Sequence, residues 1–452
     1  MTKKIFGTDG IRGKANVYPM TPEMALRVGK AAAIVFRDLN KKERHKVVIG
    51  KDTRLSGYIF ETALTAGLCS MGVDVYLVGP MPTPAIAQLT KSLNADAGIM
   101  ISASHNPATD NGIKLFGKDG FKLPDSVEQE MEKLLLSEHI ASDHIQGDLI
   151  GKAFRINDSR GRYIEYAKST IKSMSLKGLK IVVDCANGAA YQVAQVIFSE
   201  LGAEVIALNA QPNGLNINLN CGAMHPEVIA AEVKKQKADV GIALDGDADR
   251  VIFVDENGNE VDGDHIIAIG AIDLKNKNRL VKDTVVSTVM ANLGFEEALA
   301  KHGIKVVKTQ VGDRYVMDVL QKEGYSLGGE QSGHIIFSDY STTGDGIITA
   351  LQILRIMRQQ GKKLSELTSC MKSYPQILVN VKVKEKKELV KMGKVKSSIT
   401  DAEKELGKNG RVLVRYSGTE NLARVMIEGK QQKQIEKLAD KIANEIRKEI
   451  GI

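Results

Sequence analysis

The sequence of 452 residues contains no tryptophan, and aromatic residues make up only 5% of it. Single-stranded nucleic acids are bound largely by stacking of bases on aromatic side chains, so this shortage argues against such a partner. The formal charge of +7 is a small difference between 62 basic and 55 acidic residues. The lysine-rich stretches alternate with glutamates or apolar residues at helical spacing, which favours solvated helix faces. We therefore expect no nucleic-acid partner, and the modest positive balance is compatible with phosphorylated small molecules.

The sequence also lacks a secretory signal and a membrane span. The first ten residues reach Asp9 without an apolar core, and no later apolar run approaches the length that crosses a membrane. The four cysteines are scattered and form no C-x-x-C pair, which argues against a disulfide framework and against a zinc site. These absences predict a cytoplasmic protein without a membrane partner.

What the sequence does contain is a unit of strand, loop, helix, glycine and strand that occurs three times. Its copies begin with apolar residues near 47–49, 181–183 and 285–286. The glycines that follow the helices, where a left-handed residue ends a helix, are Gly72, Gly202 and Gly303. Alternating strands and helices of this kind are typical of α/β domains.

After about residue 370 the pattern changes to a few strands and two lysine-rich helices. We therefore predict an α/β protein with three related α/β domains that have mixed sheets, plus a smaller C-terminal α+β domain, around a central cleft. The expected boundaries are residues 1–155, 156–256, 257–371 and 372–452. In such domains the functional loops gather at one end of the strands, so the loops of several domains can share one cleft.

A further strand in each copy leads into an unusually polar loop. Residues 102–106 read Ser-Ala-Ser-His-Asn, residues 245–250 read Asp-Gly-Asp-Ala-Asp-Arg, and residues 330–334 read Glu-Gln-Ser-Gly-His. Three equivalent loops therefore carry three different chemistries.

The first of these loops presents Ser104 and His105 between a buried strand near 99–101 and two turns, marked by Asn-Pro at 106–107 and Asn-Gly at 111–112. A reactive hydroxyl is one interpretation. The alternative is a loop whose side chains only satisfy local backbone groups. A serine hydrolase is disfavoured, because no G-x-S-x-G motif surrounds Ser104.

The second loop predicts a metal site. Asp245, Asp247 and Asp249 alternate, and in extended backbone this spacing points their carboxylates to one side. An oxygen-only cluster suits Mg²⁺, and a phosphoryl group, which Ser104 could carry, would complete the ligands. An EF-hand is excluded because Arg250 occupies the position of its required glycine. A solvated acidic turn is the alternative.

Three further features have both a functional and a plain structural interpretation. Residues 415–420, with Arg424, combine guanidinium groups, hydroxyls and a glycine, and so predict a phosphate-binding loop rather than a surface turn. Glu330 and Ser332 could recognise a polyol or only form a glycine-rich turn. Lys114 is a candidate proton shuttle if burial or charge lowers its pKa, and otherwise an exposed lysine.

These motifs resemble those of the α-D-phosphohexomutase superfamily, most closely its phosphoglucosamine mutase branch, along the whole chain. The resemblance rests on residues 6–13 (Phe-Gly-Thr-Asp-Gly-Ile-Arg-Gly), 102–114, 245–250, 329–334 and 415–420. Gln331 and residues 311–315 (Val-Gly-Asp-Arg-Tyr) resemble the glucosamine branch. The last motif departs from the family pattern, because Asn421 replaces the usual proline and Ala423 a larger residue. We expect a slightly looser turn there.

The resemblance implies a role for each motif. Ser104 would be phosphorylated in the working enzyme and would share a Mg²⁺ ion with Asp245, Asp247 and Asp249. The transferring phosphoryl group would be surrounded by Arg12, His105, Lys114, as general acid/base, and Arg250. Sugar hydroxyls would be bound by Glu330 and Ser332. The non-reacting phosphate would be bound by Arg415, Ser417, Gly418, Thr419 and Arg424.

The implied reaction is the reversible conversion of glucosamine 6-phosphate to glucosamine 1-phosphate, which feeds UDP-N-acetylglucosamine synthesis, with glucosamine 1,6-bisphosphate as intermediate. We expect the fourth domain to move about a hinge near residues 370–376 while the intermediate turns. A phosphomannomutase or phosphoglucomutase with the same chemistry is the alternative, and a non-catalytic phosphosugar-binding protein is a remote one. The oligomeric state stays open, a homodimer included.

Overall fold

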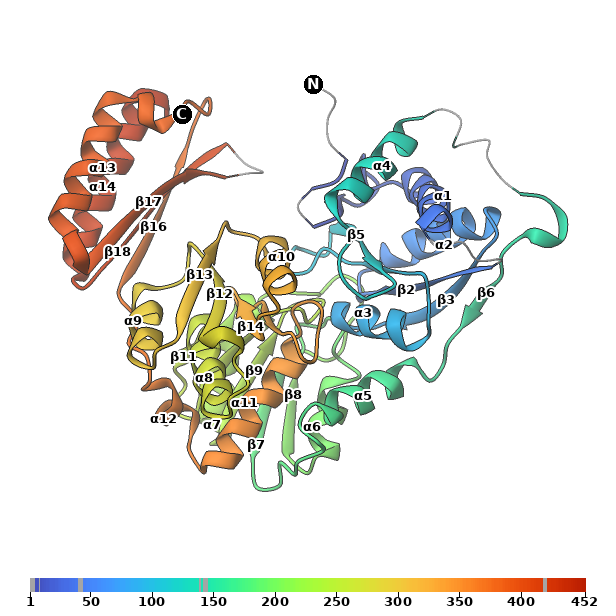
Figure 1. Ribbon diagram of the computed structural model, residues 1–452, viewed down its shortest axis with the longest axis horizontal. Helices are drawn as coiled ribbons and strands as arrows, with labels where there is room; N and C mark the ends of the chain where they lie inside the picture. The colour runs from blue at the N-terminus through green and yellow to red at the C-terminus, as the bar shows by residue number, and fades with distance from the viewer. Residues whose placement is uncertain (1–4, 8, 40–43, 138–139, 141–144, 418–420) are drawn as a thin grey trace. The chain divides into compact units, whose positions relative to one another are not determined.

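The structure is a computed structural model that describes the chain except residues 1–4, 8, 40–43, 138–139, 141–144 and 418–420 (Figure 1). The chain divides into two compact units. The first comprises residues 1–290 and 302–370, and the second comprises residues 291–301 and 371–452.

The first sheet of the larger unit has six strands. In spatial order these are β1 (Ile11–Lys14), β5 (Asp110–Gly117), β4 (Ala97–Ile101), β2 (His45–Lys51), β3 (Val73–Pro80) and β6 (Ala153–Arg155). One face packs against α1 (Pro22–Leu39), α2 (Gly57–Ser70) and α4 (Asp125–Leu136). On the other face lies α3 (Thr83–Ser92), where a side chain at Gly50 would collide with Ile86 and one at Gly98 with Thr90.

The second sheet has five strands. Their order is β11 (Glu260–Val261), β10 (Val251–Asp255), β9 (Val240–Leu244), β7 (Lys180–Asp184) and β8 (Glu204–Leu208). The surrounding helices are α5 (Ser159–Ser169), α6 (Ala194–Glu200) and α7 (Pro226–Gln236). Ile229 and Val233 of α7 form a core with Val182 and Val254 of the sheet.

The third sheet has four strands. Their order is β13 (Lys305–Thr309), β12 (Thr284–Thr288), β14 (Leu327–Gly329) and β15 (Ile335–Phe337). The helices of this region are α8 (Gly263–Asn276), α10 (Asp313–Glu323), α11 (Gly346–Gln360) and α12 (Leu364–Thr368). Val316 and Leu320 of α10 pack on one face of the sheet. Gly270 of α8 allows Phe337 to approach on the other face.

The threefold repeat predicted from the sequence is confirmed by the strand order. Each sheet contains four strands in the same arrangement, β5-β4-β2-β3, β10-β9-β7-β8 and β15-β14-β12-β13, of which the first pair is antiparallel and the other two pairs are parallel. The predicted glycines are left-handed, with φ of 84° at Gly72, 93° at Gly202 and 66° at Gly303. The mixed α/β sheets are therefore as expected.

The smaller unit is the predicted α+β domain. Its sheet has the order β16 (Gln376–Lys382), β18 (Leu422–Gly429) and β17 (Gly410–Tyr416), all antiparallel. Two helices cover one face, α13 (Gly393–Leu406) and α14 (Gln432–Ile450). Apolar residues of α14 recur every three or four positions, at Ile435, Leu438, Ile442 and Ile446, and all are buried.

The helix α9 (Leu293–Lys301) groups with this smaller unit, although it follows β12 in the chain. The backbone N–H of Leu293 donates to Oε1 of Glu428 at 2.7 Å, and Gly294 allows the carbonyl of Lys372 to approach closely. The predicted domain boundaries remain predictions.

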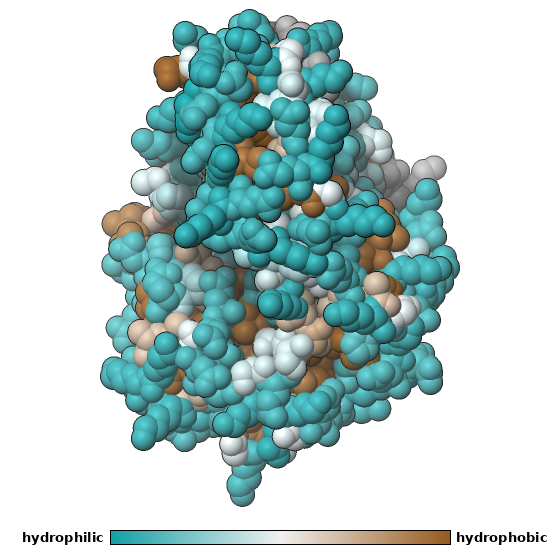
Figure 2. All heavy atoms as spheres, turned by 90° about the vertical axis from the view of Figure 1, so that its left-hand side faces the viewer, coloured by the Kyte–Doolittle hydropathy of each residue, from teal (hydrophilic) through white to brown (hydrophobic). Residues whose placement is uncertain are grey.

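In the part of the chain that the structure describes, no helix is long and apolar enough to cross a membrane. Figure 2 shows one face of the molecule, where hydrophilic residues predominate and hydrophobic ones form small patches between them. This distribution matches the charged residues that make up 26% of the sequence.

Candidate active site

The predicted reactive loop directly follows β4, whose residues are all buried. Ser104 is only 1% exposed, and its hydroxyl donates to Oδ2 of Asp245 at 2.6 Å. Nδ1 of His105 lies 3.4 Å from the same hydroxyl. Two of the predicted loops, distant in sequence, therefore meet at the oxygen of Ser104.

The three aspartates of the second loop form one cluster, as predicted. Each offers a carboxylate oxygen within 4.8 Å of those of the others, and all three side chains are buried. The predicted geometry was wrong, because residues 246–249 form a turn with a left-handed Ala248 (φ 57°), not an extended strand. The turn, rather than strand alternation, gathers the carboxylates.

The electrostatics of the cluster are unequal. Burial and the charges of Asp249 and Asp247 hold the pKa of Asp245 well above its usual range. Burial would also raise the pKa of Asp249, but Lys114 and His334 outweigh it and hold that pKa well below its usual range. Oδ1 of Asp247 is buried and accepts no hydrogen bond from the described residues. This orphaned carboxylate oxygen, in an oxygen-only donor set, fits a hard divalent cation.

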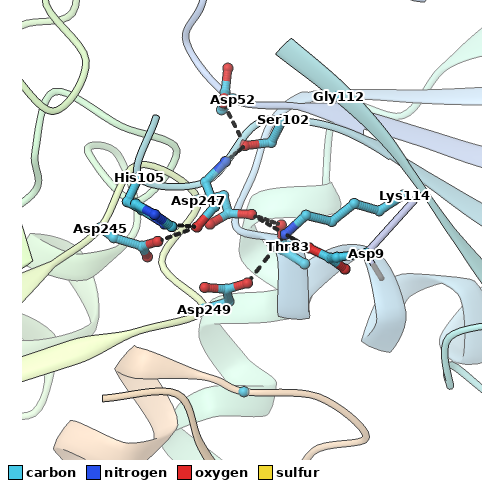
Figure 3. Close-up of polar contacts among 12 residues, drawn as sticks. Asp9, Asp52, Thr83, Ser102, His105, Gly112, Lys114, Asp245, Asp247 and Asp249 are labelled. Atoms are coloured by element: carbon cyan, nitrogen blue, oxygen red, sulfur yellow. Dashed lines mark hydrogen bonds and ion pairs between the residues drawn. The ribbon is translucent and has the colours of Figure 1, made fainter. Parts of the chain in front are cut away.

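Lys114 lies on β5 beside the cluster and is 1% exposed. Its ammonium group lies 2.8 Å from Asp247 and 3.2 Å from Asp249, and 3.3 Å from Asp9 (Figure 3). Burial would lower the pKa of Lys114, but these three carboxylates outweigh it and hold the pKa well above its usual value. Lys114 is therefore a buried cation among these carboxylates, and its role as general acid/base stays a prediction.

The predicted arginines bring positive charge to the site. Burial first, and then the charges of Arg250 and Arg12, lower the pKa of His105 to about 4, so its imidazole is neutral at pH 7. Nε of each arginine is buried and makes no hydrogen bond within the described part of the chain. Donors of this kind, next to a hydroxyl and an acidic cluster, suit a phosphoryl group.

The third predicted loop packs on the same region. The backbone N–H of Val251, the residue after Arg250, donates to the carbonyl of Gly333 at 3.1 Å. Glu330 accepts from the backbone N–H of Gly312 at 3.1 Å and from the hydroxyl of Ser332 at 3.3 Å. Its carboxylate is thus fixed in orientation, as recognition of a hydroxyl-rich ligand requires.

Sequence reasoning missed several charged residues that complete the site. Lys122 contacts both Asp9 and Asp313. His334 lies 3.7 Å from Asp249 and 3.7 Å from Asp313. The ion pairs therefore form a closed ring, which runs through Lys114, Asp249, His334, Asp313, Lys122 and Asp9 and back to Lys114. Asp9 lies in the motif of residues 6–13 that carries the family resemblance, whereas Lys122 lies in none of the motifs.

Thr83 was also missed. Its hydroxyl donates to Oδ2 of Asp247 at 2.6 Å, and its backbone N–H donates to the Asp247 carbonyl at 2.9 Å. It begins α3, a helix whose sequence contains no chemical signal, and only the packing of the first sheet against the second reveals its contact.

The predicted phosphate-binding residues lie in the smaller unit. Arg415 of β17 and Arg424 of β18 are directly paired across the sheet, and so lie on one face. Burial and the charge of Arg424 lower the pKa of Arg415. Like charges placed opposite each other destabilise a sheet, so this pair is typical of an anion-binding surface. Ser417 is buried, whereas Gly418 and Thr419 lie outside the described residues.

Comparison with known proteins identifies the class. The chain belongs to the phosphoglucomutase/phosphomannomutase family, whose alpha/beta/alpha domains I, II and III match residues 3–140, 161–258 and 262–374, and whose C-terminal domain matches residues 378–445. The resemblance predicted from the motifs is confirmed.

Within this family the chain is similar to proteins named phosphoglucosamine mutase. It is 59% identical to that of Geotalea daltonii and 58% identical to that of Pelobacter propionicus, in each case over 99% of both chains. The similarity extends over nearly the whole length of both chains.

Solved structures share the fold. A phosphoglucomutase/phosphomannomutase family protein from Burkholderia thailandensis superposes with a TM-score of 0.82 at 24% identity, over 99% of both chains. An Aspergillus fumigatus N-acetylphosphoglucosamine mutase superposes with a TM-score of 0.67 at 20% identity, over 98% of this chain and 96% of the other.

Proposed function

We propose that this protein interconverts glucosamine 6-phosphate and glucosamine 1-phosphate through a phosphorylated Ser104. The names of the relatives support the reaction, and the observation that carries it is the 2.6 Å contact between the Ser104 hydroxyl and Asp245. A phosphoryl group on this oxygen would lie against the acidic cluster and would be repelled by it. A divalent cation bound between the aspartates and the phosphoryl group would remove this repulsion.

The reaction consists of two transfers. The phosphoryl group on Ser104 moves to O1 of glucosamine 6-phosphate, the O–P bond to the serine breaks, and the proton of the O1 hydroxyl ends on the serine oxygen. The resulting 1,6-bisphosphate turns around. The phosphoryl group at O6 then moves to the oxygen of Ser104, the O6–P bond breaks, the proton of the serine hydroxyl ends on O6, and glucosamine 1-phosphate leaves.

The residues of the site favour these transfers mainly by position and charge. Arg12 and Arg250 would stabilise the negative charge spread over the transferring group, and the raised pKa of Lys114 favours its charged form. His105 stays neutral at pH 7 beside the serine oxygen. Which group moves the proton stays a prediction, with Lys114 implied by the resemblance.

Mg²⁺ fits the three aspartates, because their ligands are all oxygens and one buried oxygen has no other partner among the described residues. Bound there, with an oxygen of the Ser104 phosphate, it would neutralise charge on the phosphoryl group. The Aspergillus fumigatus enzyme was solved in complex with GlcNAc-6P and magnesium, and a variant of it with glucose 1,6-bisphosphate. Glucosamine 1,6-bisphosphate would accordingly be the intermediate here.

Glu330 and Ser332 would bind the sugar hydroxyls, and the paired arginines of the smaller unit would bind the phosphate that does not react. Because the substrate must bind in two orientations, one phosphate-binding surface serves both. A cytoplasmic location, a homodimer and a hinge near residues 370–376 remain predictions.

The test is a set of coupled assays on glucosamine, glucose and mannose phosphates. The account expects the highest kcat/KM with the glucosamine phosphates. Faster turnover of the glucose or mannose phosphates would assign the chain to the phosphoglucomutase or phosphomannomutase activity of its family. If none of the three sugar phosphates is turned over, the result would favour a non-catalytic phosphosugar-binding protein.

A further inference from the structure

The backbone of Ser104 is left-handed, with φ of 52°. Residues other than glycine seldom adopt this conformation, and it persists only where the surroundings hold it in place. The serine predicted to carry the phosphoryl group is therefore held in an unfavourable conformation, and the structure shows by what.

Two side chains hold the carbonyl groups of this loop. Arg54 donates to the carbonyl of Ser104 at 2.9 Å and to that of Asn106 at 2.8 Å. Asn218 donates to the same two carbonyls, at 2.9 Å and 3.1 Å. Arg54 precedes α2 and Asn218 follows β8, so the loop is held from both the first and the second sheet regions.

The same carbonyl also lies against the aspartate loop. A Cβ atom on Gly246 would lie 2.6 Å from the carbonyl oxygen of Ser104 and 2.7 Å from the amide nitrogen of Asn218, so that only glycine fits. Asn218 thus lies where the Ser104 loop and the loop of the three aspartates touch.

We propose that Asn218 is a positioning residue for phosphoryl transfer, which fixes Ser104 in its left-handed conformation so that its hydroxyl faces Asp245. The inference rests on the proposed function, in which Ser104 must act twice per cycle, first as phosphoryl donor and then as acceptor. Because the Ser104 loop is hydrogen-bonded to both the first and the second sheet regions, the serine oxygen occupies the same position in both transfers. Asn218 makes no contact with the Ser104 hydroxyl and acts through the backbone.

Asn218 offers a clean substitution, because its own backbone is left-handed (φ 58°) and glycine adopts that conformation without strain. Asn218→Gly therefore removes the side-chain amide and leaves the backbone conformation in place. Asn220→Gly is the matched control, since Asn220 is also left-handed (φ 52°), is exposed, and has no side-chain hydrogen bond among the described residues. Arg54 is less suitable, because it is fully buried and its loss threatens folding.

We expect Asn218→Gly to lower kcat by about 10- to 100-fold, since small displacements of a reacting group have effects of this order. KM should change by less than about twofold, because the sugar and phosphate contacts lie elsewhere, and Asn220→Gly should match the wild type. Equal kcat values for the two variants would overturn the inference.

A second readout does not depend on activity. Amide hydrogen exchange of the peptide that contains residues 103–107 should be faster in Asn218→Gly than in Asn220→Gly. If the wild type turns over none of the three sugar phosphates, the proposed function fails, and the exchange rates alone decide whether Asn218 holds Ser104. Identical exchange in the two variants would reject the positioning role.

Discussion

The loops after β4 and β9 occupy equivalent places in two copies of one architecture, and yet they carry opposite chemistry. Both strands are fully buried, each lies between a parallel and an antiparallel neighbour, and each loop contains a left-handed residue other than glycine. One loop presents a hydroxyl and an imidazole, whereas the other presents three carboxylates. The shared backbone determines where chemistry can occur, and the side chains determine which chemistry it is.

Neither loop is complete by itself. The hydroxyl of Ser104 has its partner in Asp245, and Asp247 has its partners in Lys114 and Thr83 of the first region. The repeat thus produces one site from two half-sites.

Removing the nucleophile should have the largest effect. Ser104→Ala should lower mutase kcat by at least about 1000-fold, because the loss of a covalent nucleophile cannot be compensated by binding. Intact mass spectrometry should show a phosphate on a fraction of the wild type and none on the variant. A variant with undiminished activity would reject the phosphoserine mechanism.

Removing a carboxylate from the aspartate cluster should have the second-largest effect. Asp247→Asn should reduce Mg²⁺ affinity by at least about 100-fold, more than the loss of a group that only orients a ligand. Mg²⁺ raises the thermal midpoint of a protein that binds it in the folded state, so the rise should be lost in the variant. Chelation should abolish wild-type activity, and added Mg²⁺ should restore it.

The control for this experiment is Asp148→Asn, which changes an exposed aspartate of the same unit. It should respond to Mg²⁺ as the wild type does. An unchanged Mg²⁺ response in Asp247→Asn would show that the cluster does not bind the ion.

Breaking the ring of ion pairs should have a smaller effect. Lys122→Met leaves Asp9 and Asp313 without their shared cation, so the ring that positions Lys114 is opened, and kcat should fall about 10-fold. Lys122→Arg should recover most of the loss. Lys118→Met, an exposed lysine on the same segment, should have no effect. If both methionine variants behave alike, the ring has no catalytic role.

A buried acid outside the site should have the smallest effect. Asp345 caps α11 and accepts from the hydroxyl of Tyr163 at 2.9 Å. Burial raises its pKa to about 6, even though hydrogen bonds from the backbone of Ile348 and from Tyr163 oppose the shift. The folded protein thus binds this proton more tightly than the unfolded chain. The contribution of Asp345 to stability is full below about pH 4 and falls as the pH rises through 6.

Asp345→Asn should remove this dependence. Relative to the wild type, its free energy of unfolding should rise by about 2 kcal/mol between pH 4.5 and pH 8. Calorimetric thermal midpoints at the two pH values measure the change. If the difference in free energy of unfolding between Asp345→Asn and the wild type is the same at both pH values, Asp345 does not titrate between them.

Much of the fold could be predicted from the sequence, because local signals suffice for it. Glycines such as Gly72 and Gly202 mark the ends of helices, and the apolar runs before Ser102 and Asp245 mark the buried strands. The residues of the two central loops were predictable for the same reason, since each directly follows a strand.

The parts that could not be predicted depend on contacts between distant segments. Thr83, Lys122 and Asn218 belong to the site only because separate sheets pack together, and no local pattern marks them. The raised pKa of Lys114 likewise depends on carboxylates from two other segments. The turn of the aspartate loop was mistaken for a strand because the alternation of carboxylates imitates strand periodicity.

The most direct test of the account follows the phosphoryl group itself. The wild type is incubated with glucosamine 6-phosphate that carries heavy oxygen in its phosphate, and the phosphate on the protein is located and weighed by peptide mass spectrometry. The account predicts that heavy phosphate accumulates on Ser104 as glucosamine 1-phosphate forms. Formation of product while the phosphate on Ser104 stays light, or while Ser104 carries none, would contradict it.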